Sequence, residues 1–192
     1  MTMRVNADKA FFTSDTHFFH KAMAQMRGLQ GGVDDMNAAL ITRWNEVVPK
    51  DGIVFLLGDF SFSGTTNSIS VLGQLNGQIH LIVGNHDTGL SRVVKDMFSS
   101  MSDYKEIEVE TAPAVRQRII LSHYAHRVWN MHHYGTWHLF GHSHGSLPGI
   151  GRSMDVGVDT NNLFPYSFQT IKVLLEDKPI FNADYHRGEL AC

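Results

Sequence analysis

Cysteine is almost absent from this chain, whose only thiol belongs to Cys192. A disulfide within the chain is therefore excluded, and so is a thiolate metal site, so any metal must be held by nitrogen and oxygen. No apolar run approaches the roughly 18 residues that a membrane helix needs. The first residues also lack the basic head and long apolar stretch of a secretory signal. These absences predict a cytoplasmic protein without a membrane anchor.

Charge of one sign is also scarce, with a formal net charge of −3 and a pI of about 6.4. The chain therefore has no global attraction for phosphate backbones, and a compact substrate is favoured. Its 192 residues, 43% of them hydrophobic, predict a single domain over residues 1–192. The core is expected at about 8–177 and a tail at 178–192, and no obligate protein partner is indicated. Histidine is abundant, 12 residues against 16 Lys plus Arg, which indicates metal or proton chemistry.

Five apolar runs along the chain end in polar turns that carry Asp, Asn or His. The clearest run, residues 53–57, leads directly into Gly58 and Asp59. A buried carboxylate without a partner costs many kcal/mol, and a metal ion is a favourable partner. Because open α/β sheets bind ligands beyond the carboxyl ends of their strands, we expect these turns to meet. The polar residues of the five turns are Asp15, His17, Asp59, Asn85, His86, Asp87, His123, His142 and His144.

The first half of the sequence alternates strands with amphipathic helices, which indicates a parallel sheet. Residues 18–21 and 28–32 are predicted to be loop. Three helices are predicted in this half. The first begins at a cap on Asp34 or Asp35 and ends at Pro49, and the second spans 68–76 with a cap at Gly77. The third begins at a cap on Thr88 or Ser91. From residue 104 onward, alternating residues and a turn at 112–114 are typical of an antiparallel hairpin. Residues 154–159 alternate again, and Ser167 opens a last amphipathic segment. The second half therefore predicts a second sheet packed on the first.

Seven of these nine side chains are potential metal ligands. They are too many for one ion and suit two ions that share Asp59. A pair of ions about 3.5 to 4 Å apart can clamp both the attacking and the departing oxygen of a displacement at phosphorus. This geometry predicts hydrolysis of phosphoesters. Carboxylate, amide and imidazole ligands without sulfur favour two divalent ions among Mn, Fe, Co, Ni and Zn, with Mn as the first expectation.

These blocks resemble, in order, the signature of the calcineurin-like metallophosphoesterases, and the resemblance covers roughly residues 10–175. It depends on Asp15-x-His17, Gly58-Asp59, Gly84-Asn85-His86-Asp87, His123 and Gly141-His142-x-His144. The strings Phe-Thr-Ser-Asp-Thr-His-Phe-Phe-His and Leu-Ser-His-Tyr-Ala-His are similar to the small, single-domain bacterial and phage branch. The resemblance implies a mixed α/β fold, an αββα sandwich in which two packed β-sheets are flanked by helices.

The resemblance also implies a role for each residue. One ion would be held by Asp15, His17, Asp59 and His144, and the other by Asp59, Asn85, His123 and His142. A hydroxide bridging the ions would attack phosphorus in line. His86 would protonate the leaving oxygen or stabilise its charge, and Asp87 would orient the His86 ring. Many relatives place a second acid shortly after the Gly-Asp pair, whereas this chain continues with Phe60, Ser61 and Phe62.

The remaining histidines carry weaker expectations. His20 and His126 are candidates for binding the substrate phosphate, with surface or supporting roles as the alternative. The others are expected to be packed in the core (His80, His138) or to lie in loops (His132, His133, His186). The expected substrate is a small phosphomonoester or phosphodiester, nucleotides and nucleic-acid ends included. The alternative function is a catalytically silent scaffold that keeps this fold for protein binding. A two-metal hydrolase of the β-lactamase type is disfavoured because its His-x-His-x-Asp-His cluster is absent.

Overall fold

The computed structural model describes residues 2–181, so the expectation at His186 and residues 182–192 of the predicted tail lie outside the described residues. The strands of the first half lie in a five-stranded sheet. Its order is β10 (Tyr166–Ser167), β2 (Ala10–Thr13), β3 (Ile53–Leu56), β4 (Gln78–Ile82) and β5 (Ser100–Ser102). Neighbouring strands from β2 to β5 are parallel, as predicted, and β10 is antiparallel to β2.

A second five-stranded sheet contains the strands of the second half. Its order is β1 (Met3–Asn6), β6 (Tyr104–Ala112), β7 (Val115–Ser122), β8 (Trp137–Phe140) and β9 (Ser153–Asp155). The β6–β7 pair is the predicted antiparallel hairpin, whereas the other three pairs are parallel. Strand β1 was not predicted from the sequence. It comes from the N-terminal end of the chain and pairs with β6 at the edge of this sheet.

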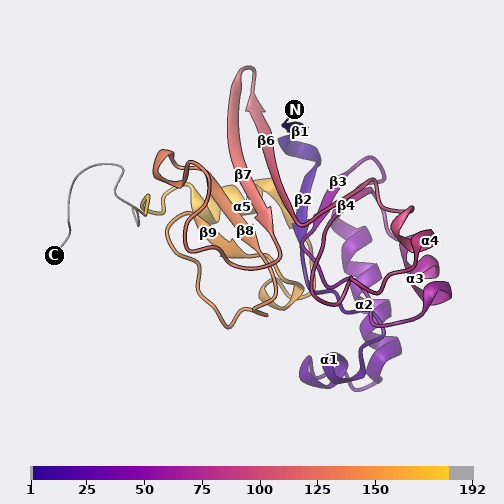
Figure 1. Cartoon of the computed structure of the whole chain (residues 1–192). Helices are drawn as coiled ribbons and strands as arrows, with labels where there is room; N and C mark the ends of the chain where they lie inside the picture. Colours follow the sequence, from indigo (N-terminus) through magenta and orange to yellow (C-terminus); the bar gives the residue numbers. More distant parts are fainter. Residues whose placement is uncertain (1, 182–192) are drawn as a thin grey trace.

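Five α-helices and three 3-10 helices connect the strands in the described part of the chain. They are α1 (Lys21–Met26), α2 (Gly32–Val47), α3 (Thr65–Leu72), α4 (Arg92–Lys95), α5 (Phe168–Leu175), η1 (Ala7–Lys9), η2 (His132–Tyr134) and η3 (Val158–Thr160). Figure 1 shows α2, α3 and α4 on one side of β2–β4 and the strands β6–β9 on the other. None of the helices between residues 2 and 181 has the length and apolarity needed to cross a membrane.

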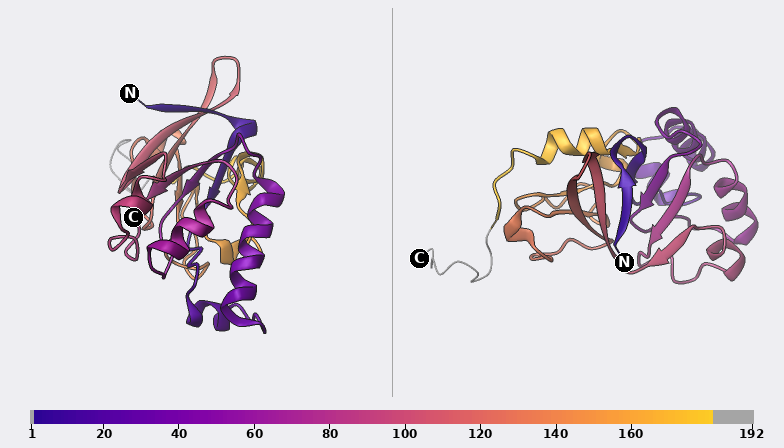
Figure 2. Two further views of the ribbon diagram at one scale, coloured as in Figure 1. Left: turned by 90° about the vertical axis from the view of Figure 1, so that its right-hand side faces the viewer. Right: turned by 90° about the horizontal axis from the view of Figure 1, so that it is seen from above.

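Alternating side chains of the first sheet form two separate cores. Phe11 of β2 packs with Met36 and Trp44 of α2, whereas the next residue, Phe12, packs with Leu139 of the second sheet. Helix α5 adds Phe168, Ile171 and Leu175 to the core between the sheets, and its place beside them can be followed in Figure 2. This alternation follows from the two-residue period of a strand. The predicted mixed α/β fold, with two packed sheets flanked by helices, is confirmed.

The N-terminal ends of two helices differ from the predictions. Helix α2 begins after Gly31, not after Asp34 or Asp35, and both acids lie in its first turn. The Asp35 side chain folds back over Gly31 into the space that a Cβ would need. Helix α1 lies between the two segments that were predicted as loop. Its cap is His20, whose Nδ1 accepts the N–H of Met23 at 3.2 Å. Histidine is not among the residues that sequence rules recognise as caps, so this helix gave no start signal.

The next two helices are displaced or shortened. Helix α3 begins at Thr65 and is capped by Gly73, so Gly77 instead takes a left-handed conformation (φ +93°) in the turn into β4. Helix α4 forms a single turn after Ser91, because Val94 is buried while Val93 is exposed. Too few apolar contacts are available to extend it.

Candidate metal centre

The seven predicted ligands lie in loops that directly follow the strands β2, β3, β4, β7 and β8. Backbone hydrogen bonds tie these loops together. The N–H of Asp15 donates to Gly58 O at 3.0 Å, and the N–H of His17 donates to Asp59 O at 3.0 Å. In the second sheet, the N–H of Gly141 donates to His123 O at 3.0 Å. Between the sheets, the N–H of His142 donates to Asp15 Oδ2 at 2.8 Å, so the carboxyl ends of both sheets form one continuous rim.

One group of ligand atoms comes from Asp15, His17 and His144, and these atoms all lie within 4.8 Å of one another. Asp15 Oδ1 lies 3.9 Å from His17 Nε2 and 4.0 Å from His144 Nε2. Two atoms that bind one ion at about 2.1 Å are separated by about 3 to 4 Å. These three side chains therefore converge in the way that a single cation requires.

A second group comes from Asp59, His123 and His142, whose ligand atoms also lie within 4.8 Å of one another. Asn85 adds its side-chain oxygen to this group, because Asn85 Oδ1 lies 3.0 Å from His123 Nε2. The His123 ring is held from its other side, where Nδ1 lies 2.7 Å from the carbonyl oxygen of Leu57. That contact places the proton of the neutral ring on Nδ1 and leaves Nε2 free to bind a cation.

Asp59 connects the two groups. Its Oδ2 atom lies 3.6 Å from His17 Nε2 and 3.6 Å from His123 Nε2. Its other oxygen, Oδ1, accepts the N–H of His86 at 2.9 Å, which fixes the carboxylate. One carboxylate oxygen therefore faces a nitrogen of each group at the same distance, the arrangement that a shared ligand needs.

The residues present fit divalent cations. Asp15 Oδ1 is buried and has no hydrogen-bond partner among residues 2–181, although two ring nitrogens face it at about 4 Å. Burial raises the pKa of Asp15 to about 6 and lowers the pKa of His17 to about 3. A cation would offset the desolvation of the carboxylate, and the neutral imidazole is the form that binds metal. All the donors in these two groups are oxygen or nitrogen atoms.

The backbone of the ligands is unusual. Five of the seven predicted ligands have φ angles between +47° and +67°: Asp15, His17, Asp59, His142 and His144. The left-handed region costs a residue other than glycine roughly 1 to 2 kcal/mol. Such conformations persist where the surrounding structure imposes them, and they cluster at functional sites. The backbone is therefore bent at these positions to direct ligands into the rim.

Glycines beside the ligands leave room for them. A Cβ at Gly58 would meet the Nδ1 atom of His123 and would lie 2.8 Å from the Cα of Gly84. A Cβ at Gly141 would meet Ser14 Oγ and would lie 2.6 Å from Asp15 Oδ2. The glycine that precedes the ligand in these two sequence blocks is thus required by close packing of the loops.

His86 and Asp87 follow one another in the chain but face different surroundings. His86 lies at the edge of the centre, with Nε2 4.0 Å from Asp59 Oδ2 and a side chain that is 40% exposed. Asp87 was predicted to orient the His86 ring, and the structure gives its carboxylate another task. It is buried and accepts the backbone N–H groups of Asp59, Phe60 and Gly84 at 2.8 to 2.9 Å. Three amide donors from neighbouring turns surround this carboxylate, and they fix the loop that carries the shared ligand.

His20 lies beside the first group of ligands. Its ring centroid is 5.6 Å from that of His17. Because Nδ1 accepts the N–H of Met23, the neutral ring carries its proton on Nε2. Burial and the neighbouring His86 lower the pKa of His20. The side chain is thus a hydrogen-bond donor close to the centre, and its contact with a phosphate stays a prediction.

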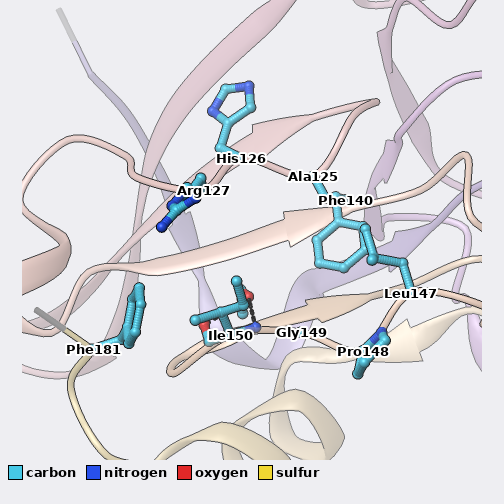
Figure 3. A pocket seen from close by; sticks show the side chains of 10 residues that line it. Ala125, His126, Arg127, Phe140, Leu147, Pro148, Gly149, Ile150 and Phe181 are labelled. Carbon is cyan, nitrogen blue, oxygen red and sulfur yellow. Dashed lines mark hydrogen bonds between the residues drawn. The ribbon is translucent and has the colours of Figure 1, made fainter. Parts of the chain in front are cut away.

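His126 is placed differently. Its ring stacks on His138 and Tyr104, with centroid distances of 4.9 and 6.0 Å. With Arg127 and Phe140 it lines a cavity of about 270 Å³ (Figure 3). Within the described chain, no predicted ligand lines that cavity. The structure therefore does not bring His126 to the seven ligands.

Two residues that sequence reasoning missed support His144 from behind. Asp159 Oδ2 accepts the Nδ1 proton of His144 at 2.6 Å. Arg27 donates to both oxygens of Asp159, at 2.7 and 2.9 Å, and to the carbonyl oxygen of Asp15 at 2.7 Å. Burial alone would raise the pKa of Asp159, but the hydrogen bonds from His144 and Arg27 hold it well below its usual range. No spacing rule relates positions 27, 144 and 159, so the sequence offered no signal for this arrangement.

Comparison with known proteins gives consistent results. A family model described as calcineurin-like phosphoesterase matches residues 9–161. The gene 66 protein of Mycobacterium phage L5 is 30% identical over 162 residues, which cover 71% of this chain and 78% of the phage protein. An uncharacterized protein of Methanocaldococcus jannaschii is 30% identical over 186 residues, or 92% of this chain and 94% of that protein. A crystal structure of a protein of unknown function from Aquifex aeolicus superimposes with a TM-score of 0.67 at 23% identity, covering 86% of this chain and 98% of the other.

Proposed function

This chain belongs to the calcineurin-like phosphoesterase family, and we propose on that basis that it is a metal-dependent hydrolase of phosphoric monoesters, diesters or both. The observation that carries the proposal is the position of Asp59 Oδ2, 3.6 Å from a ring nitrogen in each of two ligand groups. Two cations that share one carboxylate suit displacement at phosphorus, where the attacking and the leaving oxygen both carry charge.

In this proposal Asp15, His17, Asp59 and His144 hold one divalent ion, and Asp59, Asn85, His123 and His142 hold the other. The two ions, with manganese as the first candidate, would polarise the phosphoryl oxygens and supply a nucleophile derived from water. His86 protonates the leaving oxygen, because it lies at the solvent-exposed edge of the centre within 4.0 Å of the shared carboxylate. Asp87 holds the loop of Asp59, and His20 donates a hydrogen bond to a phosphoryl oxygen.

The proposed substrate is a small phosphoester, nucleotides and nucleic-acid ends included. A contact between His126 and substrate, a cytoplasmic location and the absence of an obligate protein partner stay predictions. The competing function is a catalytically silent scaffold for protein binding. The complete set of seven ligands disfavours it, because a scaffold has no need to keep five non-glycine residues in left-handed conformations.

Hydrolysis by the manganese-loaded protein tests the proposal. We expect turnover of p-nitrophenyl phosphate or bis-p-nitrophenyl phosphate, and complete loss of turnover after chelation. His86→Ala should lower kcat about 100-fold or more, because general acid catalysis typically contributes about 10² to 10⁴. Elemental analysis of the same variant should still give two ions per chain, since His86 is not a ligand in this proposal.

A matched control is Arg92→Ala, which removes a side chain that is 93% exposed and pairs with Asp96 at the end of its own helix. It should leave kcat unchanged. Unchanged turnover in His86→Ala would contradict the role of this residue. A protein that binds two ions and hydrolyses no phosphoester would support the scaffold function instead.

A further inference from the structure

A cavity of about 450 Å³ adjoins the candidate metal centre on the side of His86. It lies between residues 61–64, which follow β3, and residues 85–90, which follow β4. Asn85 and His86 themselves line it, so the cavity is continuous with the centre. Its volume falls within the range of about 300 to 1,000 Å³ that is usual for small-molecule sites.

Phe62 forms an aromatic wall of this cavity. Its side chain is 51% exposed, and its ring makes T-shaped contacts with the rings of His20 and His86, with centroid distances of 4.2 and 5.0 Å. Its backbone is fixed as well, because the N–H of Phe62 donates to Phe18 O at 2.8 Å. A large apolar ring is thus held in water beside a catalytic residue, and covering it with a ligand would remove that unfavourable exposure.

The loop that carries Phe62 is fixed to the helix that follows it. The hydroxyl of Ser61 lies 3.0 Å from that of Ser63 and 3.2 Å from that of Ser68 in α3. Ser63 and Ser68 are also within 3.3 Å of each other. The aromatic wall is therefore part of a formed site and needs little reorganisation to accept a ligand.

Among the described residues that line this cavity, none is Lys, Arg, Asp or Glu, and His86 alone is ionisable. The other polar side chains are hydroxyls and one amide (Ser61, Ser63, Thr88, Asn85). A second cavity, which is lined by Arg27, Arg43 and Asp159, differs sharply in this respect. Away from His86 the lining is uncharged, so it suits an uncharged group that offers both a planar face and hydrogen-bonding edges.

The position of His86 decides which part of a substrate reaches this cavity. A general acid must contact the leaving oxygen, so the group attached to that oxygen extends past His86 and away from the metal ligands. We propose that the leaving group is a nucleoside whose base stacks on Phe62, so the substrates are phosphoesters of nucleosides. This inference rests on the proposed function, and it adds Phe62 as the residue that determines specificity.

Two esters with the same leaving oxygen test the inference. Uridine 5′-phosphate and methyl riboside 5-phosphate share the sugar and differ in the base, and their methyl diesters form the equivalent pair if the protein is a diesterase. Stacking of a base on an aromatic ring is expected to favour the nucleotide in kcat/KM by about 5- to 150-fold. Phe62→Leu should bring the ratio of the two kcat/KM values close to one.

Tyr134→Leu is the matched control, because Tyr134 is an aromatic ring that is 68% exposed and lines a different cavity. It should preserve the full ratio. Hydrolysis of both esters at equal kcat/KM by the wild-type protein would overturn the inference while leaving the proposed function intact. A ratio that survives Phe62→Leu in a folded variant would overturn the role of Phe62.

Binding provides a readout that does not depend on turnover. If no ester is hydrolysed, the proposed function fails, and isothermal titration calorimetry of the manganese-loaded protein still tests the cavity. Uridine 5′-phosphate should bind about 5- to 150-fold more tightly than methyl riboside 5-phosphate, and Phe62→Leu should remove the difference. Equal affinity for the two compounds in the wild-type protein would overturn the inference.

Discussion

At the scale of single residues, Asp159 controls how the His144 ring is presented. Its carboxylate accepts the Nδ1 proton of His144 and is fixed in turn by Arg27, whose side chain is only 4% exposed. Asp159→Asn keeps the shape and removes the charge, so His144 becomes a weaker ligand with a less defined orientation. Loss of such a partner typically lowers metal affinity about 10- to 100-fold. We expect that loss at one of the two manganese sites, measured by isothermal titration calorimetry.

Asp96→Asn serves as the comparison, since that carboxylate is exposed and pairs with Arg92 at the surface. Both manganese affinities should match the wild-type protein in this variant. If both manganese affinities were unchanged in Asp159→Asn, the hydrogen bond from His144 to Asp159 would not be needed for metal binding.

Residue identities at the rim were predictable, but their supports were not. Asp15, Asp59 and His123 each follow an apolar run, so strand ends alone predicted that they would meet. Arg27 lies between the two segments predicted as loop, and Asp159 ends the segment predicted to alternate, so only the folded chain brings them to His144. The partner of Asp87 was predicted wrongly, because adjacency in sequence suggested His86 whereas the backbone turns around Asp59 offered three amide donors.

At the scale of elements, Asp87 joins the loop after β3 to the loop after β4. Asp87→Ala removes a buried carboxylate and leaves the N–H groups of Asp59, Phe60 and Gly84 without their acceptor. Each unpaired buried donor costs about 1 to 3 kcal/mol. We therefore expect the free energy of unfolding of the metal-free protein to fall by roughly 3 to 5 kcal/mol in urea titrations.

Asp103→Ala is a suitable reference for this measurement, because Asp103 is exposed in the bend between β5 and β6. Its effect should stay within about 0.5 kcal/mol. If Asp87→Ala lowered stability no more than Asp103→Ala, the proposed role of Asp87 in joining the two loops would be wrong.

Helices and strands could be predicted where apolar residues recur in the sequence at a regular spacing. Strands β2, β3 and β4 are short apolar runs, α2 has its apolar residues at helical spacing, and the β6–β7 hairpin alternates. Helix α1 was missed because its cap is a histidine, and β1 was missed because four residues carry too little periodicity. Helix α4 was predicted too long, because Val93 and Met97 continue the helical spacing but face solvent.

At the scale of the whole molecule, buried histidines make the fold sensitive to acid. His138 in β8 accepts the N–H of His126 on Nε2 at 3.0 Å, so the ring must be neutral. Burial lowers its pKa to about 4 from an unfolded value of 6.5. The unfolded chain therefore binds more protons between pH 6.5 and pH 4, and stability falls as the pH drops through that window. The full loss from this ring is roughly 3 kcal/mol.

Unfolding of His138→Gln in urea, measured from pH 7 to pH 4, checks this expectation. The free energy of unfolding should depend less steeply on pH in the variant than in the wild-type protein. The difference in slope should correspond to at most one proton bound on unfolding. His80 has a pKa lowered to about 4 by burial, so His80→Gln should reduce the slope in the same direction. Parallel curves for His138→Gln and wild type would contradict the assignment. Both rings were predicted as packed core histidines, and their burial confirms it.

The division into two sheets followed from the change of pattern along the chain, but only the β6–β7 pair of the second sheet is antiparallel. The sequence could not give the parallel pairing of β8 with β7 and β9, because those strands are separated by irregular segments whose path depends on packing. It also could not give the cavity beside Phe62, which arises only when the turns after β3 and β4 come together.

The left-handed backbone at five ligands has a consequence for how this fold drifts over evolutionary time. At positions 15, 17, 59, 142 and 144, glycine would relieve the conformational cost but would remove the donor atom. A descendant that no longer needed the metal ligands would gain stability from each replacement by glycine. Selection for stability alone would therefore favour loss of these ligands. Glycine at these five positions is therefore the replacement expected in descendants that no longer bind metal, whereas this chain keeps a side-chain donor at each of them.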